Sequence, residues 1–521
     1  MIFIDPAFLF LFLPIFLSAF FISRKLFGAD GAIFVVFLGS LICYAPWGLL
    51  AFLLLLTSIA INFTIGTVLV RGSGHGATRF GGALYYGGQA YNFLALIWFK
   101  YQFIQYWLAT SGAGHHFVLA AIPAGISFYT FHQAAFLADA RRGEPSAVAI
   151  CAADSLPRRV RAFVRYGAFV TFFPQMIIGP ITYMKEFLPQ VRREEFGRFH
   201  AASFSVGIFL IASGTFKKLF LADNLNLLVV NNFSAAHSGA PLTATAAWFA
   251  TMGYYAQLYF DFSGYSDIAL GLARLCGLRY PINFYSPLKA VGILDFYRRW
   301  HMTLTRVISR FVFTPLSVAG TRRSMRMAKP WRKALSLWLP LLVNFELIAL
   351  WHGATATFVV FGLLHGSWYV IETEVRATRW FKNWRKRSSE RLRAVLGRLI
   401  FVLPMMLTFA LFRSQSLEGF ARLLAALVGQ GGAGAVPAPF DWRQFAFLGF
   451  SFFVIGVLPN NIELLRRYRP GIMTFENPLS RIARLLPAWR PNWAWALLAG
   501  VLFVSGLAFI ARQPPFLYQG F

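Results

Sequence analysis

The chain has 521 residues, of which 57% are hydrophobic, 18% are aromatic and only 13% are charged. In soluble globular proteins roughly a quarter of the residues are charged. The composition of this chain therefore excludes a soluble fold and indicates an integral membrane protein. The formal net charge of +29 would suggest a nucleic-acid ligand in a soluble chain. In a membrane protein, orientation and anionic lipid account for basic charge, so we expect contact with membrane lipid and no nucleic acid.

Apolar runs of roughly 20 residues, the length that crosses a bilayer, recur from end to end. They predict a single polytopic all-α domain over residues 1–521, with 11–12 transmembrane helices. The runs lie at about 7–23, 49–69, 82–108, 117–138, 202–221, 244–272, 334–350, 354–372, 396–413, 444–460 and 493–511, with a shorter one at 31–43. Since Ser23-Arg24-Lys25 leads straight to another run, we interpret the first as a retained helix and not as a cleaved signal peptide.

Basic residues cluster in alternate loops, which gives an orientation. Thirteen Lys and Arg lie from Arg274 to Lys333, nine from Arg376 to Arg398 and six from Arg466 to Arg490, whereas the loops at 109–116 and 227–243 have none. By the positive-inside rule the rich loops face the cytoplasm. Both termini are therefore expected outside the cytoplasm.

Two stretches break the pattern of spans and loops. The run from Phe169 to Lys185 contains Pro174, Gly179 and Pro180 and has basic clusters on both sides, which predicts a re-entrant segment whose backbone is buried in protein. Residues 277–333 have no run long enough to span. Within them Phe296, Trp300, Leu304 and Ile308 recur at helical spacing, which predicts an amphipathic helix at the cytoplasmic interface, or sunk partway into the protein, with His301 in its middle.

Ionisable groups at membrane depth are expensive and are retained mainly at sites and pathways. The strongest candidate is His352, because Trp351 precedes it and Gly353 follows it, so that two apolar flanks form one kinked helix or two half-helices meeting at the imidazole. A neutral histidine facing a cavity there would suit general-base chemistry. The other such residues are Asp261, Asp267, Glu346, Asp139 and His132, each of which could equally make an interhelical hydrogen bond.

Other chemistries find little support. The cysteines at 43, 151 and 276 have unrelated spacings and indicate neither disulfides nor a metal site. The His115-His116 pair has no third ligand at a readable distance, and no nucleophile occupies a recognisable elbow. We expect no metal and no bound cofactor. A helix continuous from Glu346 to His352 would place the two on different faces, so no Glu-His dyad is predicted.

Six ordered blocks resemble the membrane-bound O-acyltransferases (MBOAT), specifically the bacterial branch around the membrane subunit of alginate O-acetyltransferase. They fall within the core 123–366 and begin with P-A-G-I-S-F-Y-T-F at Pro123. They continue with F-F-P-Q-M-I-I-G-P-I (Phe172), F-K-K-L-F-L-A-D-N-L (Phe216), Y-F-D-F-S-G-Y-S-D-I-A-L-G (Tyr259), D-F-Y-R-R-W-H-M-T-L (Asp295), and W-H-G with the later G-L-L-H-G.

The resemblance implies roles for individual residues. The family's catalytic histidine, which deprotonates the acceptor hydroxyl, falls on His352, and its second functional histidine, which positions groups or stabilises the oxyanion, falls on His301. A tunnel is expected to bring a cytoplasmic acyl thioester, acetyl-CoA or another acyl carrier, to His352. The tunnel candidates are Trp351, Asp261, Ser263, Tyr265, Asp267, Arg298, Arg299, Trp300, Pro174 and Gln175.

The function implied is acetyl transfer across the bacterial inner membrane for O-acetylation of an extracytoplasmic polysaccharide, with a separate extracytoplasmic acetyltransferase as partner. Peptidoglycan, cellulose and teichoic acid with D-alanine are alternative acceptors. A secondary transporter and a non-catalytic scaffold for polysaccharide secretion remain alternatives of other classes. The chain departs from the family after His301, where Arg306 to Phe311 and Pro315 to Val318 lack the family's Arg-Asp pair and Gly-Gly, so donor access or partner docking can differ here.

Overall fold

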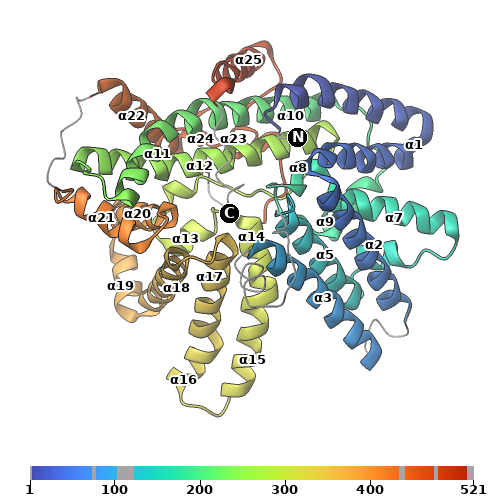
Figure 1. Ribbon diagram of the computed structural model, residues 1–521, viewed down its shortest axis with the longest axis horizontal. Coiled ribbons are helices and arrows are strands. Elements are labelled where there is room, and N and C mark those ends of the chain that lie inside the picture. Colours follow the sequence, from blue (N-terminus) through green and yellow to red (C-terminus); the bar gives the residue numbers. More distant parts are fainter. Residues whose placement is uncertain (1–2, 73–77, 102–121, 433–440, 475–478, 513–521) are drawn as a thin grey trace, which may run out of the picture. The chain divides into compact units, whose positions relative to one another are not determined.

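The computed structural model describes residues 3–72, 78–101, 122–432, 441–474 and 479–512. These residues form helices joined by turns and irregular segments, and within them the only β contact is an isolated bridge between Pro281 and Ile472. The all-α expectation is confirmed (Figure 1). The chain groups into two compact units: unit 1 comprises 1–211, 266–281 and 468–472, and unit 2 comprises 212–265, 282–467 and 473–521.

The helices up to α10 belong wholly or mainly to unit 1. They are the π-helical η1 (Ala7–Phe12), α1 (Leu13–Tyr44), the 3-10 turn η2 (Ala45–Trp47), α2 (Leu49–Arg71), α3 (Arg79–Lys100), α5 (Ile126–Arg141), α6 (Pro145–Cys151), α7 (Leu156–Thr171), α8 (Phe173–Met176), α9 (Met184–Val191) and α10 (Ala201–Thr215).

The later helices belong wholly or mainly to unit 2. They are η3 (Phe216–Ala222), α11 (Asp223–Ser238), α12 (Ala244–Leu275), η4 (Pro287–Lys289), α13 (Ile293–Tyr297), α14 (Met302–Ile308), η5 (Ser309–Phe313), α15 (Thr314–Ser324), α16 (Lys329–Lys333), η6 (Ala334–Trp338), α17 (Leu339–His352), α18 (Ala356–Ala377), α19 (Arg379–Arg387), α20 (Glu390–Arg413), α21 (Leu417–Leu427), α22 (Trp442–Gly456), α23 (Asn461–Leu464), η7 (Arg466–Tyr468), α24 (Arg481–Leu485), α25 (Trp493–Leu507) and η8 (Ile510–Arg512).

Within the part of the chain that the structure describes, five continuous helical stretches have the length and apolar composition that a membrane span needs: Ala7–Trp47, Leu49–Arg71, Ala201–Ser238, Lys329–His352 and Glu390–Arg413. The two runs predicted at 7–23 and 31–43 therefore lie in one stretch, which kinks at Gly28, where φ is 71°. Helices α3, α12, α18, α22 and α25 cover most of the other predicted runs. The runs at 82–108 and 117–138 extend beyond the described residues, as does the predicted loop at 109–116 with His115 and His116.

The segment predicted to be re-entrant forms no continuous helix. After α7 the chain makes the single turn α8 and then irregular backbone up to α9, and residues 166–184 are buried within unit 1. His132 of α5 accepts a hydrogen bond at Nε2 from the backbone N–H of Thr182, 3.2 Å away. That imidazole therefore satisfies a donor of the irregular segment, whereas the sequence suggested a bond between helices.

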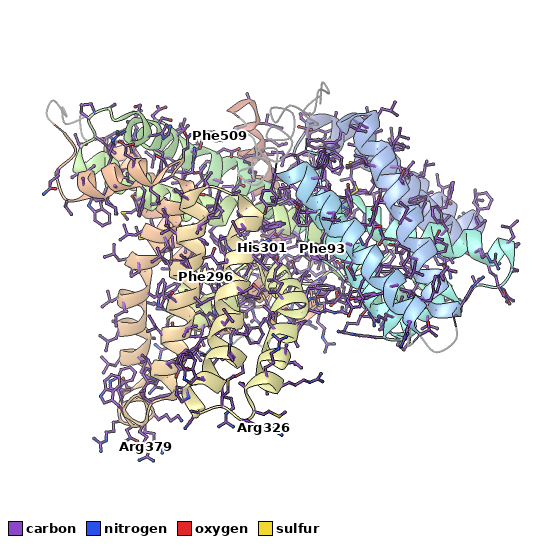
Figure 2. The ribbon with its side chains drawn as sticks, turned by 60° about the horizontal axis from the view of Figure 1, so that its bottom comes forward. Phe93, Phe296, His301, Arg326, Arg379 and Phe509 are labelled. Carbon is purple, nitrogen blue, oxygen red and sulfur yellow. The ribbon has the colours of Figure 1, made fainter. Side chains whose placement is uncertain are left out.

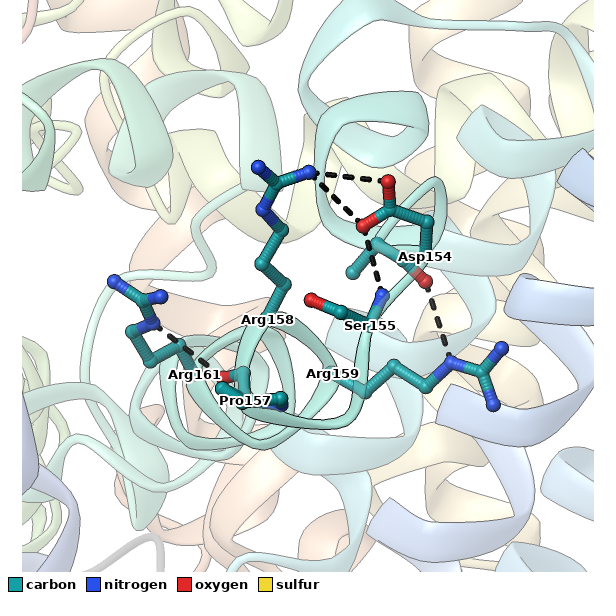
Figure 3. Close-up of polar contacts among 7 residues, drawn as sticks. Asp154, Ser155, Pro157, Arg158, Arg159 and Arg161 are labelled. Carbon is teal, nitrogen blue, oxygen red and sulfur yellow. Dashed lines mark hydrogen bonds and ion pairs between the residues drawn. The ribbon is translucent and has the colours of Figure 1, made fainter.

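Helix α7 begins at a polar cap on the surface of unit 1 (Figure 3). Asp154 Oδ1 accepts the N–H of Ser155 at 2.7 Å, and both carboxylate oxygens accept Arg158 Nη1 at 3.0 Å. Hydrogen bonds from the backbone, then from Arg158, lower the pKa of Asp154. The carboxylate thus stays charged where the positive end of the helix dipole favours a negative group.

Residues 302–352 of unit 2 form a helical hairpin, which we call the arm. Its first helical limb is α14, η5 and α15, and its second limb is α16, η6 and α17. Figure 1 shows α15 and α17 side by side. The hydroxyl of Ser317 donates to the carbonyl of Ser336 at 2.6 Å. At about 1.5 Å per residue each limb is roughly 30–35 Å long. The arm begins next to His301 and returns at His352, while its tip lies at Met325.

The prediction of one continuous amphipathic helix through His301 is wrong, because the helix is interrupted there. Helix α13 ends at Tyr297, and α14 starts at Met302 after a turn in which His301 adopts the left-handed conformation, with φ 43° and ψ 49°. The N-terminus of α13 is fixed by Glu372 of α18, whose Oε2 accepts the N–H of Ile293 at 2.7 Å. Phe296, Trp300 and Leu304 are nevertheless all buried, as the hydrophobic pattern requires.

The break predicted at the W-H-G motif is confirmed. Helix α17 ends at His352, Gly353 has an extended backbone, and α18 starts at Ala356. The ring of Phe358 lies directly against Gly353, which leaves no space for a side chain there. The imidazole of His352 is therefore at a helix terminus, and it is buried.

Candidate active site

His301 and His352 line one small cavity inside unit 2. Its volume is about 30 Å³, room for about two water molecules. Figure 2 shows His301 and Phe296 in the interior of this unit, away from Arg326 and Arg379 at one of its ends. The lining residues are Leu258, Phe296, Tyr297, Trp300, His301, Leu304, Thr305, Ile348, His352, Phe361, Phe409 and Phe412.

Aromatic rings surround both imidazoles. Phe262 meets His301 edge-on with ring centroids 4.7 Å apart, and Phe412 meets His352 at 4.9 Å. The indole of Trp351 contacts both, at 6.1 Å from His301 and 4.6 Å from His352. The two histidines thus share an apolar surrounding in which electrostatic interactions are stronger than in water.

His301 is anchored to Asn283. Its Nδ1 is 3.1 Å from Asn283 Oδ1, which also accepts the backbone N–H of Thr303 at 3.3 Å and the hydroxyl of Thr303 at 3.0 Å. The backbone carbonyl of Asn283 accepts the N–H of Met302 at 3.1 Å. Asn283 therefore caps the first turn of α14 from a distant part of the chain, and this cap holds His301 in its left-handed conformation.

Burial determines the protonation state of His301. The side chain is 3% exposed, and desolvation lowers its pKa from the usual 6.5 to about 3. A histidine in this environment is neutral near pH 7, which is the form that can take up a proton.

A second buried pair adjoins the cavity. The hydroxyl of Tyr297, a lining residue, lies 2.7 Å from Nδ1 of His365, the histidine of the G-L-L-H-G motif. His365 stacks on Phe361, another lining residue, with ring centroids 4.0 Å apart. His365 thus contacts two residues of the cavity wall, Tyr297 and Phe361, and is not itself a lining residue.

Asp261 belongs to a buried ion cluster and does not line the cavity. Lys218 Nζ is 2.6 Å from Asp261 Oδ1 and 2.7 Å from Asp223 Oδ1, and all three side chains are at most 2% exposed. The cluster joins η3, α11 and α12 and carries a formal charge of −1. An ammonium group between two carboxylates is the paired arrangement that buried charges require.

The remaining predicted tunnel residues divide between the units. In unit 2, Trp300 lines the cavity and Trp351 contacts both histidines. Arg299 pairs with Asp295 at 2.8 Å, and Arg298 is exposed. Ser263 and Tyr265 are buried in α12, outside the cavity lining. Pro174, Gln175 and Asp267 are buried in unit 1.

Glu346 and His352 form no dyad in the described contacts. The carboxylate of Glu346 lies against Gly362 of α18, on another face of α17. Asp139 is buried near the end of α5 in unit 1. Among the described residues no group of three or more His, Cys, Asp or Glu could hold a metal ion, and the three cysteines are buried thiols.

Several residues of the site carry no signal in the sequence. Asn283 stands in an irregular stretch, and its partner lies 18 residues further on. Phe409 and Phe412 come from α20, outside every quoted motif. Tyr297 was within a motif, but only the 2.7 Å contact reveals its link to His365. Two buried imidazoles in a small apolar cavity, with no acidic side chain among the lining residues, suit proton transfer from a neutral hydroxyl.

Comparisons with known proteins point to acyl-transferring enzymes. Residues 149–417 match the family model described as MBOAT, membrane-bound O-acyltransferase family. The peptidoglycan O-acetyltransferase of Helicobacter pylori is 31% identical over 83% of this chain and 80% of its own. The probable alginate O-acetylase AlgI of Pseudomonas aeruginosa is 31% identical over 82% of this chain and 75% of its own. The teichoic acid D-alanyltransferase of Bacillus subtilis is 26% identical over 50% of this chain and 60% of its own.

Proposed function

Because this chain belongs to the membrane-bound O-acyltransferase family, we propose that it takes an acetyl group from a cytoplasmic thioester, acetyl-CoA, and passes it across the membrane for O-acetylation of an extracytoplasmic polysaccharide. As a multi-pass membrane O-acyltransferase it acts on an acyl donor and a hydroxyl acceptor. The donor, the direction and the polymer are the proposed part.

The observation that carries the proposal is the cavity that His301 and His352 share. Acyl transfer from a thioester forms a C–O bond to the acceptor and breaks the C–S bond of the donor. The proton of the hydroxyl has to leave oxygen, and it ends on the sulfur of the departing thiol. We assign its removal to His352, which is at the helix break, with His301 beside the same space.

The size of the cavity supports a small acyl group. A space of about 30 Å³ walled by phenylalanine and tryptophan side chains fits a two-carbon group far better than a fatty acyl chain. The names of two relatives, an O-acetyltransferase and an O-acetylase, point the same way.

The basic end of unit 2 supports cytoplasmic donor binding. The tip of the arm and α19 together carry most of the basic residues between 322 and 387, and Figure 2 shows Arg326 and Arg379 at the same end. Under the positive-inside rule this end faces the cytoplasm of a bacterial inner membrane, with both termini outside. The proposed acceptor on the other side would be served by a separate extracytoplasmic acetyltransferase.

The test is transfer of radiolabel from acetyl-CoA in proteoliposomes, with an extracytoplasmic partner or a polysaccharide extract as acceptor. We expect His352→Ala to lower transfer by about 100-fold or more, since general-base catalysis is worth about 10²–10⁴ in rate. His301→Ala should also lose most of the activity. His200→Ala, which removes an exposed histidine of unit 1, serves as the matched control.

The alternatives make different predictions. A scaffold would support polymer acetylation equally well with His352→Ala. A transporter would move a substrate while acetyl-CoA stays intact. Either result, with the variants folded and inserted, would overturn the acyltransferase mechanism assigned to this cavity.

A further inference from the structure

We infer that Asn283 is a positioning residue that fixes the tautomer of His301 with its proton on Nδ1, so that Nε2 of His301 is a second proton acceptor of the cavity beside His352. The inference deepens the proposed acyl transfer and rests on it. It changes the role expected for His301 from the sequence, which was to position groups or to donate to the oxyanion.

The orientation of the Asn283 amide follows from its neighbours. The backbone N–H of Thr303 points at this amide, with 3.3 Å between nitrogen and Oδ1. A backbone N–H can only donate, so the atom that it meets has to be the carbonyl oxygen. If the amide were turned round, its NH₂ group would face that N–H, and a buried donor in the first turn of α14 would lose its acceptor.

The tautomer of His301 follows from the orientation of the amide. Asn283 Oδ1 has no proton, so the 3.1 Å contact with Nδ1 is a hydrogen bond only if the histidine donates it. In neutral imidazole one ring nitrogen carries the proton and the other carries a lone pair. Nε2 is therefore the lone-pair nitrogen, whatever group it meets.

This tautomer decides which step His301 can perform. A neutral Nε2 cannot donate a hydrogen bond to the oxyanion of the tetrahedral intermediate. It can take the proton of a hydroxyl, after which both nitrogens are protonated and Nδ1 keeps its bond to Asn283. The proton then passes to the thiolate when the C–S bond breaks, and the imidazole returns to its starting state.

The backbone explains why the support comes from Asn283 and not from a helical neighbour. His301 has φ 43° and therefore precedes α14 in a conformation that no helix supplies. A non-glycine residue in this conformation is strained and persists only where the surrounding structure holds it. Asn283 holds the turn through its main-chain carbonyl and its side chain at once, at Met302 and Thr303.

The direct test is ¹⁵N NMR of the histidine side chains in the full-length protein, reconstituted in lipid and labelled on histidine, with His301→Gln identifying the resonance. We expect the shift of a protonated nitrogen at Nδ1 and of a lone-pair nitrogen at Nε2. A proton on Nε2 in the parent protein would overturn the inference. The measurement needs no activity, so it stays informative if the proposed acetyl transfer is wrong.

The second test is kinetic and uses the radiolabel assay. Asn283→Ala should lower kcat about 10–100-fold, by analogy with the loss seen when the hydrogen-bond partner of a metal-ligating histidine is removed, with the KM for acetyl-CoA unchanged. Asn283→Asp keeps an acceptor for Nδ1 and adds negative charge, so it should retain activity and move the limb of the pH profile that reports the base to higher pH.

The matched control is Asn92→Ala in unit 1. Asn92 is also buried, and its amide exchanges hydrogen bonds of 2.7 and 2.9 Å with Asn62, so its loss reports the general cost of removing a buried asparagine. If Asn283→Ala and Asn92→Ala lose stability and activity alike, and Asn283→Asp leaves the pH profile unmoved, Asn283 has a packing role only.

Discussion

His301 combines a left-handed backbone with nearly complete burial. Each costs free energy, the first through steric strain and the second through loss of hydration for the charged form. Both are consistent with a residue that is held for its chemistry. The shared partner Asn283 supplies part of the compensation through the hydrogen bonds at the start of α14.

Burial of His301 makes folding stability depend on pH. The unfolded chain binds a proton at this histidine below about pH 6.5, whereas the folded chain does not until about pH 3. Stability from this group is therefore complete above pH 6.5 and is lost as the pH falls from 6.5 toward 3. At pH 5 the loss is about 2 kcal/mol, at about 1.4 kcal/mol for each unit below 6.5.

Thermal unfolding in detergent at pH 7.5 and pH 5 measures this dependence. The parent protein should show a larger fall in Tm between the two values than His301→Gln. The exposed His200→Gln should behave as the parent does. Equal falls in the parent and in His301→Gln would show that the imidazole is protonated in the folded state at pH 5.

The residues found from sequence and the residues missed differ in a physical way. His352 stood out because a polar group inside an apolar run is expensive, and that cost can be read without coordinates. Asn283 did not stand out, because a polar residue in an irregular stretch is ordinary until its partner is known. The aromatic lining residues from α20 could not be picked out either, since phenylalanine is common throughout the predicted spans.

At the scale of elements, helices α10 and α12 approach each other at glycines. A Cβ built at Gly271 would lie 2.7 Å from the carbonyl oxygen of Gly207, and one at Gly264 would lie 2.8 Å from that of Gly214. The two pairs are seven residues apart on both helices, which keeps them on one face. Close backbone packing of this kind is the usual role of small residues between membrane helices.

Gly271→Ala should therefore destabilise the protein by about 1–3 kcal/mol, because the added methyl group meets main chain and the side chain of Ile211. The control is Gly449→Ala in α22, where nothing lies within 4 Å and alanine should add up to about 1 kcal/mol of helix stability. Tm measurements on the two variants should move in opposite directions. Unchanged stability in Gly271→Ala would contradict the close packing.

Sequence patterns predicted the long helices better than the breaks between helices. Apolar runs gave most of the long helices, since burial in lipid or protein requires them. They did not give the break at His301, because the hydrophobic spacing of Phe296, Trp300 and Leu304 is helical although the backbone is not. Phe296 belongs to α13 and Leu304 belongs to α14, and each side chain is buried on its own helix. The helical spacing of apolar residues therefore continues across a break in the backbone.

At the scale of the molecule, the arm separates the basic tip from the histidines of unit 2. Its two helical limbs run roughly 30–35 Å from Met325 back to His301 and His352. This length is about the thickness of the hydrocarbon core of a bilayer. If the tip faces the cytoplasm, the arm places the cavity lined by His301 and His352 far from that side.

Cysteine labelling tests this orientation. Met325→Cys puts a thiol at the exposed tip, while the native cysteines are buried. A membrane-impermeant maleimide should label the variant in inverted membrane vesicles and leave it unlabelled in intact spheroplasts. The reverse pattern would place the tip outside and would overturn the proposed direction of transfer.

The separation between tip and cavity also has an energetic consequence. A charge that crosses the membrane gains or loses about 2.3 kcal/mol for each 100 mV of potential, and the phosphates of acetyl-CoA would make such a crossing strongly voltage-dependent. An acetyl group is uncharged. If only that group moves past the histidines while the nucleotide stays at the basic end, the electric field does no work on it, and the turnover of proteoliposomes should be the same with and without a potassium diffusion potential.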